Sequence, residues 1–357
     1  MVIGVDAGAL AEKDERLHVG VYRVTHELLK YLSEIDTVNT YRLYSYAPIP
    51  SMVIKNFGKN MINISSPTPF AYMCVQLPVR LLFAPVDLFL GVAQAVPYGI
   101  GKSIGFIYDL GFLHHPEVYG RQAIALERQT EALIIRSFHI ITISEASKRD
   151  IMDTFRVEGN RVTVAYPGVS EVFRKNKEKM IHPNPYFLMV GFVNPGKNIP
   201  LAISAFEKFM RKVNKPYDLV IIGGDTGLDP EIQKTIDRFH LHNHVHLLGR
   251  IPDMSVAKWY KSAVGLLALS VTEGFCLPSV EALASGCPVI YAKNGALPEI
   301  VGEAGIGVSI KNEKTIIDAM MLMTRRKIDT QKRAEKYQWQ TFTKKIYDCI
   351  GSCTHTQ

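Results

Sequence analysis

Two series of apolar, strand-like segments alternate with amphipathic segments along this sequence, and this alternation constrains the fold more than any other feature. It is typical of α/β proteins, in which helices cover both faces of a mostly parallel sheet. The first series has strand-like segments at 2–5, 41–46, 88–90, 103–107, 140–143 and 162–165. The second has them at 186–190, 219–222, 244–247, 265–268 and 288–291. The sequence therefore predicts two α/β domains.

Helices are expected between these strands. Residues 21–33 carry apolar side chains near helical spacing, and residues 145–155 follow Ser144, a suitable helix cap. Residues 200–213 form a third predicted helix. Lysines, prolines and asparagines dominate the stretch 174–185, which suits a linker between domains. The predicted division is an N-terminal domain at 1–168, a linker at 169–185 and a C-terminal domain at 186–339, and a chain of 357 residues can bury two such cores.

Composition limits the class of protein. The longest uncharged apolar run, 88–101, contains a proline and is too short to cross a bilayer as a helix. The first strand begins at residue 2, so no signal peptide is recognisable and a cytoplasmic location is expected. Five scattered cysteines indicate no disulfide framework. The net charge of +7, densest at 325–327 and 332–333, fits a solvated helix face or attraction to polyphosphates or an anionic membrane surface. No nucleic-acid recognition motif accompanies it.

Two carboxylates flank the start of one predicted helix in the stretch EGFCLPSVEALASG, residues 273–286. Pro278 suits the first helical turn, so we expect a helix from Leu277 to residue 284, ended by the Ser-Gly pair that follows. Glu273 then precedes the helix and Glu281 lies about one turn into it. The backbone N–H groups between them point off a helix amino terminus, where the helix dipole favours a phosphate; they belong to Gly274, Phe275 and Cys276.

Carboxylates beside a phosphate site are expected to bind hydroxyl groups. A carboxylate can accept two hydrogen bonds from a vicinal diol, which is how acidic side chains recognise ribose or hexose. A nucleotide sugar presents ribose, diphosphate and hexose in that order. One carboxylate would hold each sugar, with the diphosphate between them. The alternative for Glu281 is an exposed helix carboxylate with no ligand.

The E-x7-E pattern of this stretch resembles the signature of the retaining glycosyltransferases of family four, the group 1 glycosyltransferases. The family's usual YEGFGLPPLEAMACGTPVI corresponds to Thr272 followed by EGFCLPSVEALASGCPVI, and LPEIVG at 297–302 resembles its SLPEVVGD. The resemblance runs nearly end to end and implies the GT-B fold, in which two Rossmann-like domains face each other across a cleft. It also implies that the last helix, 340–357, crosses back to the first domain, with Trp339 buried at the crossing.

The resemblance assigns nucleotide-sugar binding to the second domain. Glu273 would contact the donor hexose and Glu281 the ribose. MVGFVNPGKN at 189–198 resembles the family's VGRLEPRKN, so Lys197 would neutralise the diphosphate. Gly196 and Phe192 stand where the family often has arginines, which leaves one cation unless another lysine or arginine reaches in. The predicted donor-binding residues are Gly191, Lys197, Asn198, Gly224, Glu273, Gly274, Phe275, Cys276, Leu277 and Glu281.

The same resemblance places acceptor or cleft residues in the first domain. FIYDL at 106–110 resembles the family's TIHDL, with Tyr108 in place of the histidine and Asp109 kept. Asp109 would orient a substrate, or else cap a helix. Gly20 would lie in the turn before the first helix, and Ser144 would contact substrate or cap the next helix. The predicted catalytic residues are Glu273, Lys197 and Asp109.

Four histidines alternate along one stretch of the second domain and raise the question of a metal site. They are His240, His242, His244 and His246. The last two would share one face of a strand, but no other ligands are evident from the sequence. No metal site is therefore predicted.

The function that the resemblance implies is retaining transfer of a hexose from a nucleoside diphosphate sugar to a hydroxyl of a glycan or lipid-linked acceptor. We expect no cofactor and no divalent metal, GDP-mannose as the first donor candidate and UDP-hexoses as the next. A role in surface polysaccharide or lipopolysaccharide synthesis, with peripheral contact at the inner membrane face, is expected. The alternatives are a non-catalytic nucleotide-sugar-binding or glycan-binding relative, suggested by Tyr108, Gly196 and Phe192, and a sugar-nucleotide epimerase or phosphorylase of the same fold.

Overall fold

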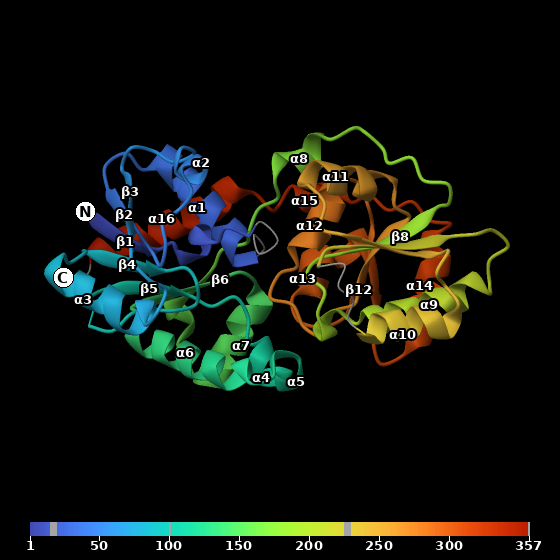
Figure 1. Cartoon of the computed structure of the whole chain (residues 1–357), viewed down its shortest axis with the longest axis horizontal. Coiled ribbons are helices and arrows are strands. Elements are labelled where there is room, and N and C mark those ends of the chain that lie inside the picture. The colour runs from blue at the N-terminus through green and yellow to red at the C-terminus, as the bar shows by residue number, and fades with distance from the viewer. Residues whose placement is uncertain (15–19, 100, 225–229, 356–357) are drawn as a thin grey trace. The chain divides into compact units, whose positions relative to one another are not determined.

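The computed structural model of the chain describes residues 1–14, 20–99, 101–224 and 230–355. The chain divides into two compact units, Met1–Gly168 with Gln338–Gln357, and Val169–Tyr337. Each unit has one parallel sheet with helices packed against it (Figure 1). These two sheets confirm the predicted fold class.

The first unit contains a seven-stranded sheet in the order β3-β2-β1-β4-β5-β6-β7. Its strands are β1 (Val2–Asp6), β2 (Thr40–Ser45), β3 (Met61–Ser65), β4 (Leu88–Gly91), β5 (Ser103–Phe106), β6 (His139–Thr142) and β7 (Val162–Val164). Its helices are α1 (Gly20–Ile35), α2 (Ser51–Ile54), α3 (Leu77–Phe83), α4 (Gly111–His114), α5 (Pro116–Tyr119), α6 (Gln122–Arg136), α7 (Glu145–Phe155) and α16 (Trp339–His355). In the described part of the chain, no helix combines the length and apolar character needed to cross a membrane.

The second unit contains a six-stranded sheet in the order β10-β9-β8-β11-β12-β13. Its strands are β8 (Tyr186–Val190), β9 (Asp218–Ile222), β10 (Val245–Gly249), β11 (Gly265–Ala268), β12 (Val289–Ala292) and β13 (Gly305–Val308). Its helices are α8 (Glu171–Lys175), α9 (Ile199–Met210), α10 (Pro230–Phe239), α11 (Asp253–Ser262), α12 (Leu277–Ala284), α13 (Leu297–Val301), α14 (Glu313–Met323) and α15 (Gln331–Ala334).

The sheet of the second unit is buried on both faces. Alternate residues of the central strand β8 enter two different apolar cores: Tyr186 and Leu188 pack on one side, and Phe187 and Met189 on the other. A strand covered on both faces needs an unbroken apolar run, which is why β8 reads YFLMV. Parallel strands bring all their carboxyl ends to one edge of the sheet, where ligands of open α/β sheets bind.

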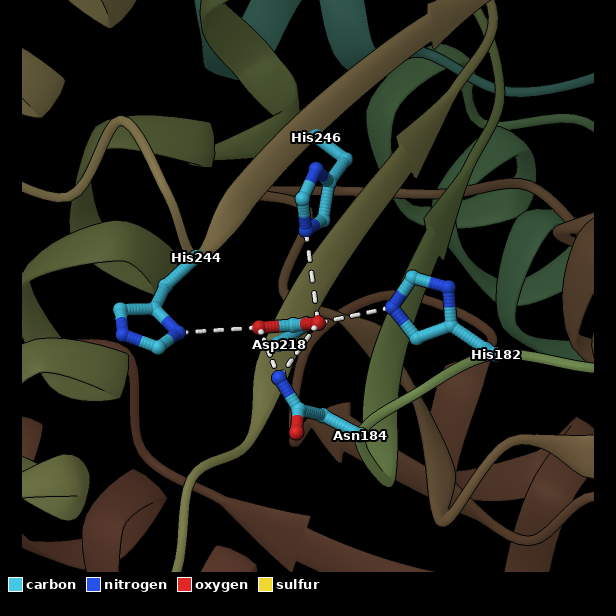
Figure 2. A network of polar contacts seen from close by, with 5 residues as sticks. All are labelled: His182, Asn184, Asp218, His244 and His246. Atoms are coloured by element: carbon cyan, nitrogen blue, oxygen red, sulfur yellow. Dashed lines mark hydrogen bonds and ion pairs between the residues drawn. The ribbon is translucent and has the colours of Figure 1, made fainter.

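The stretch 169–185 does not behave as the predicted linker, because it lies within the second unit. It begins with α8, whose Phe173 is buried in the core of this unit. Further along, His182 and Asn184 bond to the carboxylate of Asp218 at the start of β9 (Figure 2). Burial alone would raise the pKa of Asp218, but hydrogen bonds involving His244, His182 and Asn184 lower it below its ordinary value. The sequence pattern did not predict the contact between His182 and Asp218, because the two residues lie 36 positions apart.

The carboxyl-terminal helix packs with the first unit. Helix α16 contacts α1, and Trp339 at its start is 2% exposed. Gly168 lies directly against this start: a Cβ at position 168 would lie 2.2 Å from the backbone nitrogen of Trp339. The start of α16 can therefore pack this closely only because residue 168 has no side chain.

We predict that Gly168→Ala destabilises the first unit. The added methyl group would meet backbone atoms that cannot rotate away, and overpacking of this kind costs about 1–3 kcal/mol. For a unit of this size each kcal/mol lowers Tm by about 2–4 °C, which differential scanning calorimetry resolves.

The matched control is Gly351→Ala in the interior of α16, where a Cβ meets nothing within 4 Å. Replacing a helical glycine by alanine should stabilise by about 0.5–1 kcal/mol. A Gly168→Ala protein as stable as wild type would contradict the close packing described for this crossing.

Candidate functional site

The carboxyl ends of β8 and β9 come into backbone contact, and glycines make this possible. Gly191 has φ +137° and Gly223 has φ +122°. A Cβ at position 223 would lie 2.0 Å from the carbonyl oxygen of Gly191. Gly224, at φ +69°, is pressed against Val193 in the same way, with a hypothetical Cβ 2.8 Å from Cγ2. Gly223 and the predicted donor-site residue Gly224 thus have a steric role at this edge, whereas the predicted Gly191 is favoured by its positive φ.

A pocket that opens to solvent, with about 390 Å³ of space not filled by atoms, lies at this edge of the second sheet. It is formed by the ends of β8, β9 and β11, the loop after β8 and the start of α12. The residues that line it are Met189, Val190, Gly191, Phe192, Lys197, Ile199, Ile221, Ile222, Leu266, Leu267, Ala268, Leu269, Ser270, Cys276 and Pro278. Among these described lining residues, Lys197 is the one cation. Three of the predicted donor-binding residues, Gly191, Lys197 and Cys276, line this pocket, and donor binding here stays a prediction.

The side chains of Lys197 and Glu273 form an ion pair at this pocket. Ser270 donates a second hydrogen bond, of 2.7 Å, from its hydroxyl to the same oxygen, Oε1 of Glu273. The lysine side chain is 24% exposed and the glutamate side chain 16%, so the pair is partly screened by solvent. The sequence predicted separate targets for these two charges, diphosphate and hexose. The structure brings them together.

The backbone of Glu273 adds a third connection. Its carbonyl oxygen accepts a 2.9 Å hydrogen bond from the N–H of Ala296. Gly295, at φ +55°, lies so close that a Cβ there would be 2.6 Å from the same oxygen. Glu273 therefore links the loops that follow β8, β11 and β12.

Helix α12 spans Leu277–Ala284, as the sequence predicted. Cys276 precedes it in the left-handed region, at φ 72° and ψ 74°, and Pro278 occupies the first turn. The Ser279 hydroxyl donates to Sγ of Cys276 at 3.2 Å. Burial raises the pKa of the Cys276 thiol to about 12, so it stays neutral at physiological pH and adds no negative charge to the pocket. Phe275 is buried and packs edge to face on Tyr337, with 5.4 Å between ring centroids.

Glu281 is buried, with 5% of its surface exposed, so the exposed-carboxylate alternative is wrong. The Tyr260 hydroxyl lies 3.4 Å from Oε2 and donates toward it. A buried carboxylate needs partners of this kind, and a role of Glu281 in ribose binding stays a prediction. Neither Glu281 nor Glu273 lines the pocket itself; Glu273 reaches it through Lys197.

Two residues of the loop after β8, the predicted donor-site residue Asn198 and its neighbour Gly196, hold the backbone in place. Asn198 adopts φ 54°, and its side-chain amide donates a 2.7 Å hydrogen bond to the carbonyl of Leu269, at the end of β11. The carbonyl of Gly196 accepts a 2.9 Å hydrogen bond from the N–H of Val271. Both bonds fasten this loop to its neighbour and so fix where Lys197 points. Asn198 does not line the pocket.

The predicted residues of the first unit lie after neighbouring strands, and their observed contacts are structural. The Ser144 hydroxyl accepts from the N–H of Ser147 at 3.0 Å and caps α7, the alternative role expected for it from the sequence. Tyr108 donates from its hydroxyl to the carbonyl of Val92 at 2.8 Å, and burial raises the pKa of Tyr108. The Asp109 carboxylate accepts from the N–H of Gly111 at 2.9 Å, at the start of α4. Substrate contact by Tyr108, Asp109 and Ser144 stays a prediction.

Two more residues of the first unit, Gly20 and Asp6, lie at the start of α1 and at the end of β1. Gly20 is the first residue of α1, with φ +23° and open space around a hypothetical Cβ, while the preceding Val19 lies outside the described residues. Sequence reasoning missed Asp6, the last residue of β1, although it follows the apolar run VIGV. Burial raises the pKa of Asp6 to about 6, and a 3.1 Å hydrogen bond from the N–H of Gly8 partly offsets this rise. Asp6 is thus a further titratable group at a strand end.

Comparison with known proteins identifies relatives by sequence. Residues 170–340 match the family described as glycosyl transferases group 1. O-antigen chain mannosyltransferase B of Escherichia coli is 23% identical over 70% of each chain. O-antigen chain mannosyltransferase RfbU of Salmonella typhimurium is 27% identical over 67% of this chain and 65% of its own. For the MMP alpha-(1->4)-mannosyltransferase of Mycolicibacterium hassiacum, 27% identical, the match spans about half of the relative, 54% of its length.

Solved structures share the fold over the whole chain. Sucrose-phosphate synthase from Thermosynechococcus elongatus superposes with a TM-score of 0.79 at 15% identity, covering 100% of both chains. Anabaena Alr3699/HepE in complex with UDP-glucose has a TM-score of 0.75 at 14% identity and covers 98% of this chain and 99% of its own. At these identities the likeness shows the fold, which is GT-B. The match to the group 1 glycosyltransferases covers residues 170–340, which contain every residue that lines the pocket.

Proposed function

We propose that this protein is a retaining hexosyltransferase that moves mannose from GDP-mannose to a hydroxyl of a glycan or lipid-linked acceptor, without a divalent metal. The observation that carries the proposal is the Lys197–Glu273 pair at a pocket on the carboxyl edge of a parallel sheet, beside the amino end of α12. A cation and a helix amino terminus suit a diphosphate, and a neighbouring carboxylate suits sugar hydroxyls.

The chemical barrier in this reaction is charge separation. As the bond from the anomeric carbon to the diphosphate oxygen breaks, the diphosphate gains negative charge and the sugar becomes cationic. Lys197 and the N–H groups before α12 would stabilise the departing diphosphate. The acceptor hydroxyl would form its new bond on the same face, and its proton would pass to a diphosphate oxygen, which releases the nucleoside diphosphate. No protein base is required, in agreement with a pocket whose Cys276 thiol stays neutral.

Each charged residue would have a defined part. Glu273 would position Lys197 through their ion pair and accept hydrogen bonds from the hexose with its remaining oxygen, since Oε1 carries both observed bonds. Glu281, buried on α12, would accept hydrogen bonds from the ribose. The guanine base and mannose are proposed because the relatives described above include three named mannosyltransferases. Two of these are named for O-antigen chains, which supports a role in surface polysaccharide synthesis.

A nucleotide-sugar-binding protein without transferase activity is the second candidate. The observation that favours it is the lone cation among the described lining residues, where related enzymes are expected to have more. Donor binding without transfer or slow donor hydrolysis would support this candidate over the first.

We predict that one nucleoside diphosphate stabilises the protein and that Glu281→Gln removes most of this effect. A ligand at 100 times its Kd should add roughly 2.7 kcal/mol, readily seen as a rise in Tm. The measurement is a thermal-shift series with GDP, UDP and ADP and their sugars, with and without EDTA. The control is Glu303→Gln, an exposed glutamate of the same unit outside the pocket. Equal stabilisation of both variants would remove Glu281 from the donor site.

We predict that Lys197→Met lowers kcat for sugar transfer by about 10²–10³-fold, the usual cost of losing one preorganised charge-stabilising group. The control is Lys212→Met, an exposed lysine beyond the end of α9. Transfer is followed by release of nucleoside diphosphate with a glycan acceptor, and NMR of the product reports the anomeric configuration. An inverted product would contradict the retaining mechanism, and full activity of Lys197→Met would contradict the role of the lysine.

We further propose that the first unit contacts a lipid surface, as a lipid-linked acceptor would require. Helix α3, the π-helical turn Tyr72–Gln76 that precedes it and the turn at Phe70 carry apolar side chains, some buried and some exposed. Leu77 and Leu81 pack into a small core, whereas Leu82 and Phe83 are 76% and 82% exposed and Phe70 is 81% exposed. Exposed apolar side chains gathered on one segment are typical of an interaction site, and a helix end of this kind suits the bilayer interface.

We predict that Leu82→Glu/Phe83→Glu weakens binding to vesicles of anionic phospholipid at least tenfold, because each buried side chain contributes roughly 1.5–3 kcal/mol. Cosedimentation measures the bound fraction. Val38→Glu, which replaces an isolated apolar residue that is 85% exposed, is the control. Unchanged binding by the double variant would contradict a lipid contact at α3.

A further inference from the structure

A cluster of three histidines, one aspartate and one asparagine lies at the amino edge of the second sheet. Asp218 is the first residue of β9, His244 and His246 flank the start of β10, and His182 and Asn184 precede β8. The pocket lies at the opposite, carboxyl edge, about 15 Å away for strands of five residues. This cluster therefore has no part in the proposed transfer reaction.

The carboxylate of Asp218 is the centre of the cluster. Three imidazole rings approach it from three sides and the amide of Asn184 from a fourth (Figure 2). Nε2 of His182 lies 2.7 Å from Oδ2, and Nδ1 of His244 lies 3.0 Å from Oδ1. Nε2 of His246 lies 3.4 Å from Oδ2. The Asp218 side chain is 2% exposed, so its charge depends on these neighbours.

His246 is not satisfied by this arrangement. Its Nε2 atom is buried and has no partner of acceptable hydrogen-bond geometry among the described residues, although it points at the carboxylate. The 3.4 Å separation is long for a hydrogen bond but matches the spacing of two ligands on one ion. Tetrahedral zinc with bonds of 2.0–2.1 Å sets its ligand atoms about 3.3 Å apart.

We propose that His182, Asp218 and His246 bind a divalent transition metal ion, with Zn²⁺ as the representative ligand. Their ligand atoms all lie within 4.8 Å of one another, so movements of about 1 Å would bring them to tetrahedral spacing. Two imidazoles and one carboxylate form a donor set that suits zinc, cobalt and nickel and is unsuitable for magnesium or calcium, which prefer oxygen ligands.

His244 and Asn184 would support the metal ligands by hydrogen bonds to one of them, Asp218. His244 and Asn184 both bond to Asp218 and would hold its carboxylate in orientation when Oδ2 binds the metal. On the other side, the ring of His182 packs on Trp259 and Tyr186, with centroids 5.5 Å and 5.2 Å away, which limits its rotation. The metal would fasten the stretch before β8 to β9 and β10, and so stabilise this edge of the second unit.

The test uses the full-length protein without an affinity tag, freed of metal by dialysis against EDTA. Isothermal titration with ZnCl₂ should show one site per chain, and Zn²⁺ should raise Tm while Mg²⁺ and Ca²⁺ leave it unchanged. His246→Gln should abolish the site, and Asn184→Ala should weaken binding about 10–100-fold. The control is His242→Gln, because His242 belongs to the same histidine run but pairs with Asp237 outside the cluster.

Tryptophan fluorescence reports where in the chain the metal ion binds. Trp259 and Trp339 are the two tryptophans of the chain, and only Trp259 packs on a proposed ligand. Co²⁺ should therefore quench part of the tryptophan fluorescence in wild type and in His242→Gln, and none of it in His246→Gln. Retention of the GDP-induced Tm shift by His246→Gln would show that this variant is folded. Zinc binding of equal strength in His246→Gln and wild type, or no stoichiometric binding in wild type, would overturn the proposal.

Discussion

The ion pair between Lys197 and Glu273 is the interaction on which the organisation of the pocket depends. Through its side chain and backbone, Glu273 joins three loops that follow three different strands: the lysine comes from the loop after β8, Ser270 from the loop after β11, and Ala296 from the loop after β12. A pair that is partly exposed contributes little net stability. Its main effect is therefore geometric, since it holds a cation at a fixed place beside the amino end of α12.

The loops can meet in this way because the strands are parallel and their exits are made of glycine. Backbone contact between Gly191 and Gly223 leaves no room for a side chain at position 223. Asn198 and Gly196 then bond this turn to the loop after β11. Such rigidity suits electrostatic catalysis, in which charges must already be in place when the transition state forms.

The two edges of the second sheet have different chemistry. The carboxyl edge has helix amino termini, a lysine and a neutral thiol, a setting that suits phosphate. The amino edge has a buried carboxylate surrounded by imidazoles, a setting that suits a metal cation. A single α/β sheet can host both because strands of five residues keep the two edges about 15 Å apart.

The sequence by itself determined the two parallel-sheet domains and the bounds of α12, because apolar periodicity and Pro278 act within a few residues. It missed the edge strands β3 and β13, whose MINIS and GIGV segments lack a strong apolar pattern. Only the tertiary structure decided that Lys197 pairs with Glu273, 76 positions away, and that Glu281 is buried. It alone joined His182 to Asp218 and His246, since contacts between distant segments arise from how strands are ordered in the sheet, which local pattern does not encode.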